Sequence, residues 1–379
     1  MRKRPDVSAR YVISLIILGS VFCSVGKVMA QSPFKGLDNL FTTPNNYIIH
    51  HVTKPPLIDG DINDAVWQQA AWTDQFQDIE GDLKPHPYLQ TQVKMLWDDS
   101  CLYIAAQMNE PNVWAYQKHH DDIVFHDNDF EIFISPNNTA HQYFEIEVNA
   151  LNTIFDLFLN KPYRDGGNPL VSWNADGMRS AIKIQGTLND PSDTDKGWTV
   201  EMAIPFKALN MANYARMPHE GTVWRINFSR VEWDTKVVNG KYVKATDSSG
   251  YDKPEHNWVW SAQGVKNMHF PERWGYLQFT KTDNGNVTFN MPYAEQQKRY
   301  LWLVYYRERQ WQRQHNEFGL TLNQFGLDDK VMIDNRSNTL QLEATKHQFM
   351  ALITDEKDKI TWTINQDGLI QQLNNRHYE

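Results

Sequence analysis

NDFEIFISPNNTAHQYFEIEVNA, residues 128–150, is the stretch that decides the fold of this chain. Two runs of alternating apolar and polar residues flank the polar stretch 136–139. Because successive side chains of a strand point to opposite faces, this pattern predicts a half-buried β-hairpin. The apolar set would enter a core: Phe130, Ile132, Ile134, Phe144, Ile146 and Val148. The opposite set offers carboxylates, an amide and rings, a surface that suits a ligand covered in hydroxyl groups.

Similar short strand patterns, separated by turn signals, continue from Tyr47 to about Thr280. Asp59-Gly60 and Asn239-Gly240 are dipeptides typical of turns. Residues 64–67 predict the start of a short helix that packs through Trp67. The chain has 14 Trp and 13% aromatic residues, enough to fill a sandwich core and leave rings for stacking. The pattern predicts a mainly β fold.

Six segments, in order along the chain, resemble the family 9 carbohydrate-binding module. They are PPLIDGDINDAVW (55–67), VKMLWDDSCLYIAAQM (93–108), NDFEIFI with YFEIEVN (128–149), GWTVEMAIPF (197–206), WRINFSR (224–230), and WVWSAQG through PERWGYLQF (258–279). The resemblance implies an antiparallel, jelly-roll-like β-sandwich over 47–283. It also implies a non-catalytic domain that binds an oligo- or polysaccharide and assists its breakdown, often beside a glycoside hydrolase.

The resemblance further implies that sugar lies between aromatic side chains, with polar residues beneath it. Phe125 stands at the first aromatic position, six residues before Glu131, and Asn149 matches a polar position. Glu147 replaces an Arg of the family, and Met268 replaces the second aromatic residue. Nearby polar and aromatic residues can substitute for the missing contacts. The expected ligand-binding residues are Phe125, Glu131, Glu147, Asn149, Asn152, Trp173 and Met268.

Calcium is a structural ion often found in this family, although no cofactor is required for sugar binding. Calcium prefers several oxygen ligands, and acidic residues cluster at 59–64 and 121–129. The candidate ligands are Asp59, Asp61, Asp127 and Asp129. The alternative interpretation of these residues is solvated carboxylates in turns.

Three other functions stay open at this point. Glu145 and Glu147, two apart on one strand, have Cα atoms roughly 6–7 Å apart. Paired carboxylates, with Glu131 as a further member, perform glycoside hydrolysis when they flank the scissile bond. Related sandwich domains bind haem, for which Met268 and His269 offer axial ligands, although CxxCH is absent. The fourth hypothesis is a structural interaction protein that does not bind sugar.

Residues 284–379 differ in character from the sandwich region. Apolar residues at helical spacing predict one long helix that begins near Pro292. The segments 339–344, 349–355 and 359–368 predict three short strands. We therefore expect a small α+β appendage, which either docks on the sandwich or recognises a partner. Residues 31–46 form a lead segment with little periodicity.

Residues 1–30 have the pattern of a signal peptide, with a basic start and an apolar run at 11–25. Cleavage after Ala30 would remove a net charge of +4 from a chain of net charge −9 and leave about −13. That acidity argues against binding to nucleic acid or anionic lipid. We expect an exported protein, periplasmic, cell-surface or extracellular, with no membrane span after cleavage. A glycoside hydrolase or a surface glycan-uptake system is the expected protein partner.

Export predicts that the protein isolated from its native host begins at Gln31, because Val28-Met29-Ala30 places small residues at the cleavage site. N-terminal sequencing or intact-mass analysis checks this. A retained Met1 in the membrane fraction would contradict it.

Overall fold

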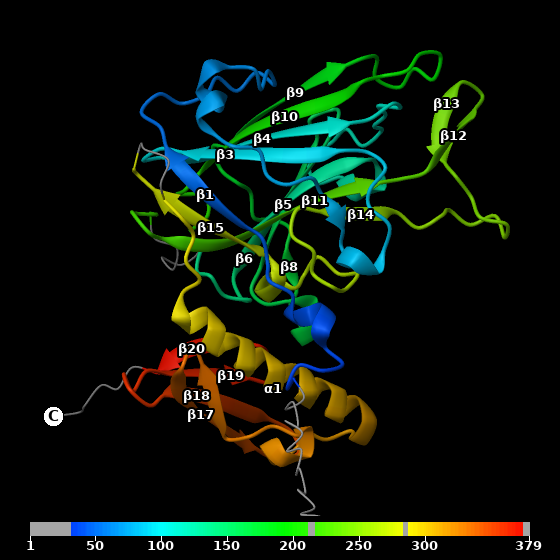
Figure 1. Ribbon diagram of the computed structural model, residues 1–379. Helices are drawn as coiled ribbons and strands as arrows, with labels where there is room; N and C mark the ends of the chain where they lie inside the picture. The colour runs from blue at the N-terminus through cyan, green and yellow to red at the C-terminus, as the bar shows by residue number, and fades with distance from the viewer. Residues whose placement is uncertain (1–31, 211–216, 283–286, 374–379) are drawn as a thin grey trace, which may run out of the picture.

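A computed structural model describes residues 32–210, 217–282 and 287–373. The predicted signal peptide and its cleavage point after Ala30 lie outside the described residues. Figure 1 shows a large β-sandwich above a smaller unit built from one long helix and a second sheet. Within the described ranges, none of the helices is both long and apolar enough to cross a bilayer.

The sandwich is one 13-stranded sheet that curls so that its two halves face each other. One half contains, in order, β8 (Pro169–Leu170), β7 (Ile154–Leu159), β6 (Tyr143–Asn149), β5 (Asp129–Ser135), β11 (Val223–Glu232) and β15 (Gly275–Thr280). The other contains β1 (Asn46–His51), β3 (Thr91–Trp97), β4 (Cys101–Asn109), β10 (Gly197–Pro205) and β9 (Arg179–Gln185). β14 (His256–Val259) joins β11 to β2 (Gln77–Asp78). The predicted β-sandwich is therefore confirmed.

Strand β1 joins the two halves, and its pairing differs from the antiparallel expectation. It runs parallel to β15 over five residue pairs and parallel to β3 over two, His50–Leu96 and His51–Trp97. The other strand pairs of the sandwich are antiparallel. The short parallel contact lets the sheet turn a corner at β1 while both neighbours keep their backbone partners.

The core lies between the two halves, as the alternating pattern predicts. Ile132 and Ile146 are fully buried and pack in one cluster with Ile104 and Met202 from the opposite half. The hairpin β5–β6 pairs Ile132 with Ile146, so its apolar residues share the inner face. The polar residues of both strands consequently face away from the core.

The smaller unit contains helix α1 (Tyr293–His315) and a five-stranded antiparallel sheet. Its strands are β16 (Lys330–Ile333), β17 (Arg336–Ala344), β18 (Phe349–Asp355), β19 (Thr361–Asn365) and β20 (Ile370–Leu373). Pro292 caps the helix as predicted, and Asn316 ends it in a left-handed conformation. The sequence predicted β17 to β19 but missed β16 and β20, because these short edge strands expose most of their residues.

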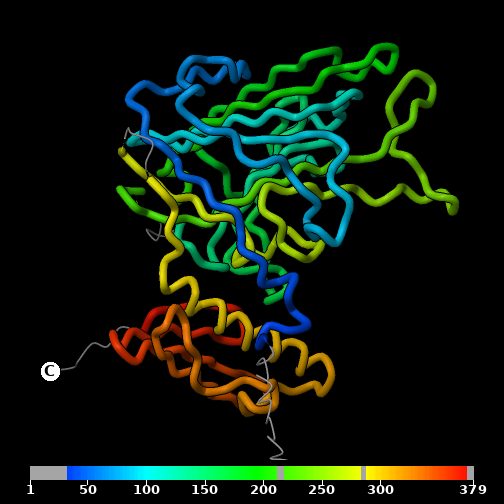
Figure 2. Tube along the Cα trace, in the orientation of Figure 1, coloured from blue at the N-terminus to red at the C-terminus, as the bar shows by residue number. Residues whose placement is uncertain are grey.

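Short elements complete the chain. The predicted turn at Asn239-Gly240 connects β12 (Thr235–Val238) to β13 (Lys241–Lys244), and fully buried Trp67 lies in a short helical turn as expected. The 3₁₀ turns are η1 (Asp38–Phe41), η2 (Ala65–Gln69), η3 (Gly81–Leu83), η4 (Val124–His126), η5 (Tyr163–Asp165), η6 (Pro271–Arg273) and η7 (Leu322–Phe325). Figure 2 traces the lead segment, in blue, down to α1, where Leu37 and Phe41 enter the helix core.

Buried ion pairs hold the smaller unit against the sandwich. Arg225 of β11 donates to Glu295 of α1 at 2.8 Å, and Lys298 donates to the same carboxylate at 2.7 Å. Glu295 is only 4% exposed, so its charge depends on these partners. The sequence left open whether the appendage docks, and the structure shows that it does.

Replacing Glu295 with Ala should destabilise the chain by about 3–5 kcal/mol, because Arg225 would keep a buried charge without its carboxylate partner. Urea unfolding of the full chain measures the change. Glu317→Ala is the control, since it removes an exposed pair with Lys346 and should cost no more than about 1 kcal/mol. Equal effects of the two substitutions would contradict this role for Glu295.

Candidate functional site

A cleft of about 630 Å³ lies on the outer face of the half-sheet β5–β6–β7. Alternation places there the side chains that do not enter the core. Loops close its rim: one contains η4, one contains η5, and one precedes η6. The lining residues are Ile123, Phe125, Glu131, Phe133, Glu145, Glu147, Phe155, Leu157, Tyr163, Pro169, Val171, Val231, Glu255, Asn257, Asn267, Met268 and His269.

Carboxylates form the floor of this cleft because of the strand register. Glu131 of β5 lies directly opposite Glu147 of β6, and Glu145 lies opposite Phe133. Asp129 precedes Glu131 by two residues and therefore shares its face. One oxygen each from Asp129, Glu131 and Glu147 lie within 4.8 Å of one another. Like charges directly opposite each other destabilise a sheet, so this arrangement needs a reason beyond folding.

Burial raises the pKa of all four carboxyl groups, and repulsion within the group adds to it for Asp129, Glu145 and Glu147. Burial, opposed in part by Ser229, raises the pKa of Glu131 to about 7. Burial and then the charge of Glu131 raise the pKa of Glu145 to about 8. The same two causes, burial first, raise the pKa of Glu147 and of Asp129 well above the ordinary range. Near neutral pH these four carboxyl groups are therefore stabilised by binding protons or by another positive charge nearby.

The floor has free hydrogen-bonding capacity. Asp129 Oδ2, Glu131 Oε2 and Glu145 Oε2 are buried and find no hydrogen-bond partner among the described residues. Glu147 Oε2 accepts the backbone N–H of Phe125 at 3.1 Å. The lining, within the described part of the chain, contains no Lys or Arg. Buried polar atoms usually have partners, so three unpartnered oxygens on one sheet face, two of them on residues that line the cleft, indicate a ligand site.

The rim offers aromatic surface. The rings of Phe125 and Tyr163 are 39% and 41% exposed, which is unusual for large apolar groups in this chain. His269 packs against Tyr163 and forms a hydrogen bond with the hydroxyl of Tyr143 at 2.9 Å. Burial, and then the charge of Arg164, lower the pKa of His269 to about 4, so the imidazole is neutral near pH 7. The cleft thus combines an acidic floor with partly aromatic walls.

Four of the predicted ligand-binding residues line this cleft: Phe125, Glu131, Glu147 and Met268. They come from β5, from β6 and from two loops that are far apart in the sequence. Met268 is only 8% exposed, so it contributes to the wall and offers little stacking surface. Whether these residues contact a ligand stays a prediction.

The other three predicted residues lie outside the cleft. Asn149 is fully buried, donates to Asp127 at 2.9 Å and accepts from the backbone of the turn that follows β6. Trp173 packs against Phe144 in the core between the half-sheets. Asn152 donates to the backbone of Ser180. Alternation correctly indicated the face of Asn149, but the end of the strand already lies beneath the loop at 115–117.

Three of the four predicted metal ligands, Asp59, Asp61 and Asp127, do not belong to a converging acidic group in the described residues. Asp61 pairs with Lys183 at 2.7 Å, and Asp59 accepts the backbone N–H of Asp61. Asp127 accepts two backbone N–H groups, those of Tyr116 and Gln117. These carboxylates stabilise turns and loops. Of the four candidates, only Asp129 belongs to a converging group of acidic side chains in the described residues.

Sequence reasoning missed several lining residues, namely Phe133, Phe155, Tyr163, Glu255 and Asn257. Phe133 was on the correct face of the hairpin but was not selected. Tyr163 lies in the loop 160–169, where its neighbour Arg164 points the other way and pairs with Glu272 at 3.0 Å. Only the fold brings Glu255 and Asn257 of the β14 region to the same cleft.

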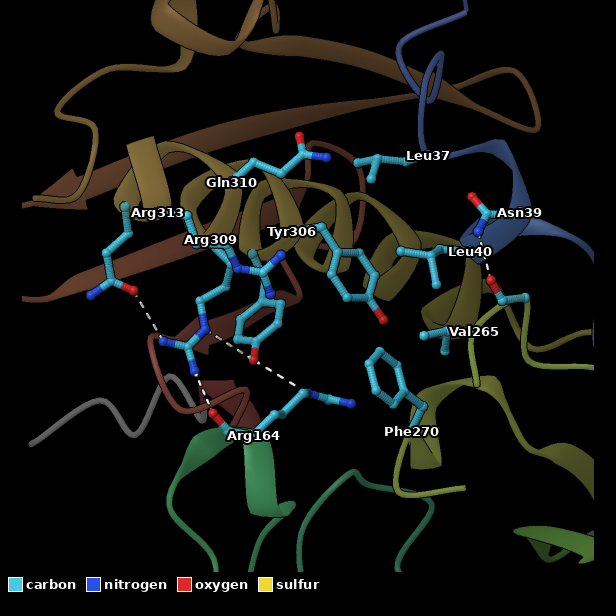
Figure 3. Close-up of a pocket in the computed structure, with 13 residues that line it drawn as sticks. Leu37, Asn39, Leu40, Arg164, Val265, Phe270, Tyr306, Arg309, Gln310 and Arg313 are labelled. Carbon is cyan, nitrogen blue, oxygen red and sulfur yellow. Dashed lines mark hydrogen bonds between the residues drawn. The ribbon is translucent and has the colours of Figure 1, made fainter. Parts of the chain in front are cut away.

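A second cavity, of about 380 Å³, lies between α1, the lead segment and the loops of the sandwich (Figure 3). Two of its three arginines are already paired: Arg164 with Glu272, and Arg309 with Asp165 at 2.6 Å. Tyr305 also donates to Asp165, at 2.5 Å. This cavity belongs to the interface between the two units, so we assign the candidate site to the acidic cleft.

Comparison with known proteins identifies related sequences and folds. The profile of the family described as "Carbohydrate family 9 binding domain-like" matches residues 58–278. The chain is 27% identical over 161 residues to Exoglucanase XynX of Acetivibrio thermocellus, a match that covers 42% of this chain and 12% of that protein. The chain therefore spans only a small part of this curated relative.

Several solved structures resemble the chain, among them two that were solved with their ligands. One is a carbohydrate binding module family 9 from Caldicellulosiruptor kristjanssonii in complex with cellotriose, 16% identical, with a TM-score of 0.38, covering 65% of this chain and all of that one. The other is the module of the same family and organism in complex with glucose, 17% identical, with a TM-score of 0.37, covering 63% of this chain and all of that one.

The raised pKa values predict how stability depends on pH. Between the ordinary glutamate pKa of 4.5 and the folded-state values of about 7 and 8, the folded chain binds more protons than the unfolded chain. The contribution of these groups is therefore full below pH 4.5 and is lost as pH rises through 7 and 8. Glu145→Gln should reduce the loss of unfolding free energy with rising pH by up to about 1.4 kcal/mol per pH unit. The measurement includes a chelator, so that no metal ion contributes to the stability.

Urea unfolding between pH 5 and 8.5 measures the decline in both proteins. Glu343→Gln, a change at an exposed position of β17, is the control and should leave the slope unaltered. Parallel curves for wild type and Glu145→Gln would show that Glu145 ionises normally.

Proposed function

Because this chain belongs to the carbohydrate family 9 binding domain-like family, we propose that its acidic cleft binds an oligo- or polysaccharide without cleaving it. The observation that carries the proposal is the pair of unpartnered buried oxygens on Glu131 and Glu145, which line the same cleft as the exposed rings of Phe125 and Tyr163. Sugar hydroxyls can donate to such oxygens, and the C–H faces of a pyranose pack on rings.

In this proposal each group of the cleft has a role. Phe125 and Tyr163 provide ring surface at the rim, and Glu131 and Glu147 accept hydrogen bonds at the floor. The backbone N–H of Phe125 donates to Glu147, so the ring and the carboxylate are positioned together. A binding site whose polar and stacking groups are fixed in advance loses less entropy when a ligand is ordered.

Glycoside hydrolysis is less well supported than binding. Hydrolysis needs two carboxyl groups that flank the scissile bond, about 5–5.5 Å or 6.5–9.5 Å apart. Here Glu131, Glu145 and Glu147 all project from one sheet face, and oxygens of Glu131 and Glu147 lie within 4.8 Å of each other. A sugar would meet all of them on the same side. Export and assistance to a polysaccharide-degrading enzyme or glycan-uptake system complete the proposed role.

Sugar binding predicts that Phe125→Ala and Glu131→Gln each weaken affinity about ten- to a hundredfold, because each removes stacking surface or a charged hydrogen-bond acceptor. A glycan array on the full chain identifies the ligand, and calorimetry measures its affinity. Phe125→Trp should preserve or improve binding, since the indole offers more stacking area.

Tyr251→Ala is the matched control, because it removes a ring that is 76% exposed and lies outside the cleft. It should leave affinity unchanged. If the cleft variants and the control bind the ligand equally well, the binding face lies elsewhere. If the array shows no binding at all, the structural-protein hypothesis gains support.

A further inference from the structure

The three converging carboxylates have a spacing that fits a single metal ion. Oxygens of Asp129, Glu131 and Glu147 all lie within 4.8 Å of one another. Calcium binds oxygen at 2.3–2.6 Å, so two oxygens on one ion are separated by at most about 5 Å. The strand register sets this spacing, because Glu131 and Glu147 are direct cross-strand partners and Asp129, two residues before Glu131, lies on the same face.

A second, independent observation points to a ligand at the same place. Glu145 is outside the converging trio, is 5% exposed and lines the cleft, and its Oε2 has no partner in the described part of the chain. Asp129 Oδ2 and Glu131 Oε2 are equally buried and unpartnered. Donor atoms that are left free around an acidic trio are available to an ion and its bound water.

The balance of charge around the cleft also favours a bound cation. The nearby guanidinium groups are already engaged: Arg230 with Glu110 at 2.9 Å and with Glu232 at 2.8 Å, and Arg164 with Glu272. Neither lines the cleft. Uncompensated buried carboxylates are costly, and a divalent cation neutralises two of them at once.

We propose that Asp129, Glu131 and Glu147 bind one divalent cation of the hard, oxygen-preferring class, such as Ca²⁺ or Mn²⁺. Glu131 and Glu147 reach this cation from the floor of the cleft, and Asp129 from its fully buried position beside them. The donors are all carboxylate oxygens, which suit these ions and do not favour soft metals. Glu145 lies beside the trio and adds negative charge. Water or ligand hydroxyl groups would fill the remaining coordination positions. This site goes beyond sugar binding and does not depend on it.

The test uses the full chain freed of metal by a chelator and then dialysed. Calorimetry with calcium chloride alone, and the loss of the free Mn²⁺ resonance signal, should each show one cation per chain. Glu147→Gln and Asp129→Asn, which keep side-chain volume and remove a charge, should each weaken binding at least tenfold. Asp121→Asn is the matched control, because Asp121 belongs to the other acidic group of similar spacing, His120–Asp121–Asp156. It should bind calcium like the wild type.

A thermal measurement separates metal binding from folding defects. Without metal, Glu147→Gln should melt at or above the wild-type temperature, because it removes one of several repelling charges. Calcium should raise the melting temperature of the wild type and of Asp121→Asn but not that of Glu147→Gln, since only a bound ligand stabilises the folded state. A lower melting temperature of metal-free Glu147→Gln, with an unchanged calcium response, would identify Glu147 as structural and overturn the proposal.

The remaining outcomes are also decisive. Absence of cation binding in the wild type, binding unchanged in both cleft variants, or loss of binding in Asp121→Asn would each overturn the site. Titrations of the array-derived sugar, with and without calcium, keep the two proposals apart: sugar binding without any cation binding leaves the proposed function standing and rejects the metal. Glucosamine binding without calcium binding would assign the acidic floor to an ammonium group and likewise reject it.

Discussion

The two-residue alternation along β5 and β6 is the constraint on which the rest of this structure depends. It sends Ile132 and Ile146 into the core between the half-sheets and, by the same geometry, places Glu131 and Glu147 on the outer face. A shift of one residue in register would bury the carboxylates in the core and expose the apolar side chains. The large core therefore fixes the strand register and with it the positions of the carboxylates, which cannot separate through a shift of the strands.

That rigidity explains why the carboxylates can tolerate their unfavourable surroundings. Burial and repulsion raise their pKa values, and each free oxygen costs stability that a ligand or an ion would restore. Carboxyl groups with strongly shifted pKa values are typical of functional sites. There the packing of the whole fold holds side chains in positions that their local interactions alone would disfavour. Sugar hydroxyls and a divalent cation are compatible occupants, because a cation leaves coordination positions that hydroxyl groups can fill.

The docked appendage supports the cleft by contacting the loop 160–169 of the sandwich. Tyr163 faces the cleft, whereas the next two residues, Arg164 and Asp165, face helix α1. Asp165 accepts hydrogen bonds from Tyr305 and Arg309 of the helix. The helix thereby holds this loop in place, and the loop carries Tyr163, one of the two exposed rings of the cleft. The appendage is thus a support for the cleft wall as well as an added unit.

The sequence alone determined the elements that depend on local periodicity. These are the β5–β6 hairpin with its acidic outer face and the helix that begins after Pro292, whereas the sandwich and the position of Phe125 followed from the resemblance to the family 9 module. Only the tertiary structure decided the positions set by contacts between distant segments. It buried Asn149 under a loop, placed Trp173 in the core and brought Glu255 and Tyr163 to the cleft. Alternation tells which face a side chain takes, but not what covers that face, because the covering loops come from elsewhere in the chain.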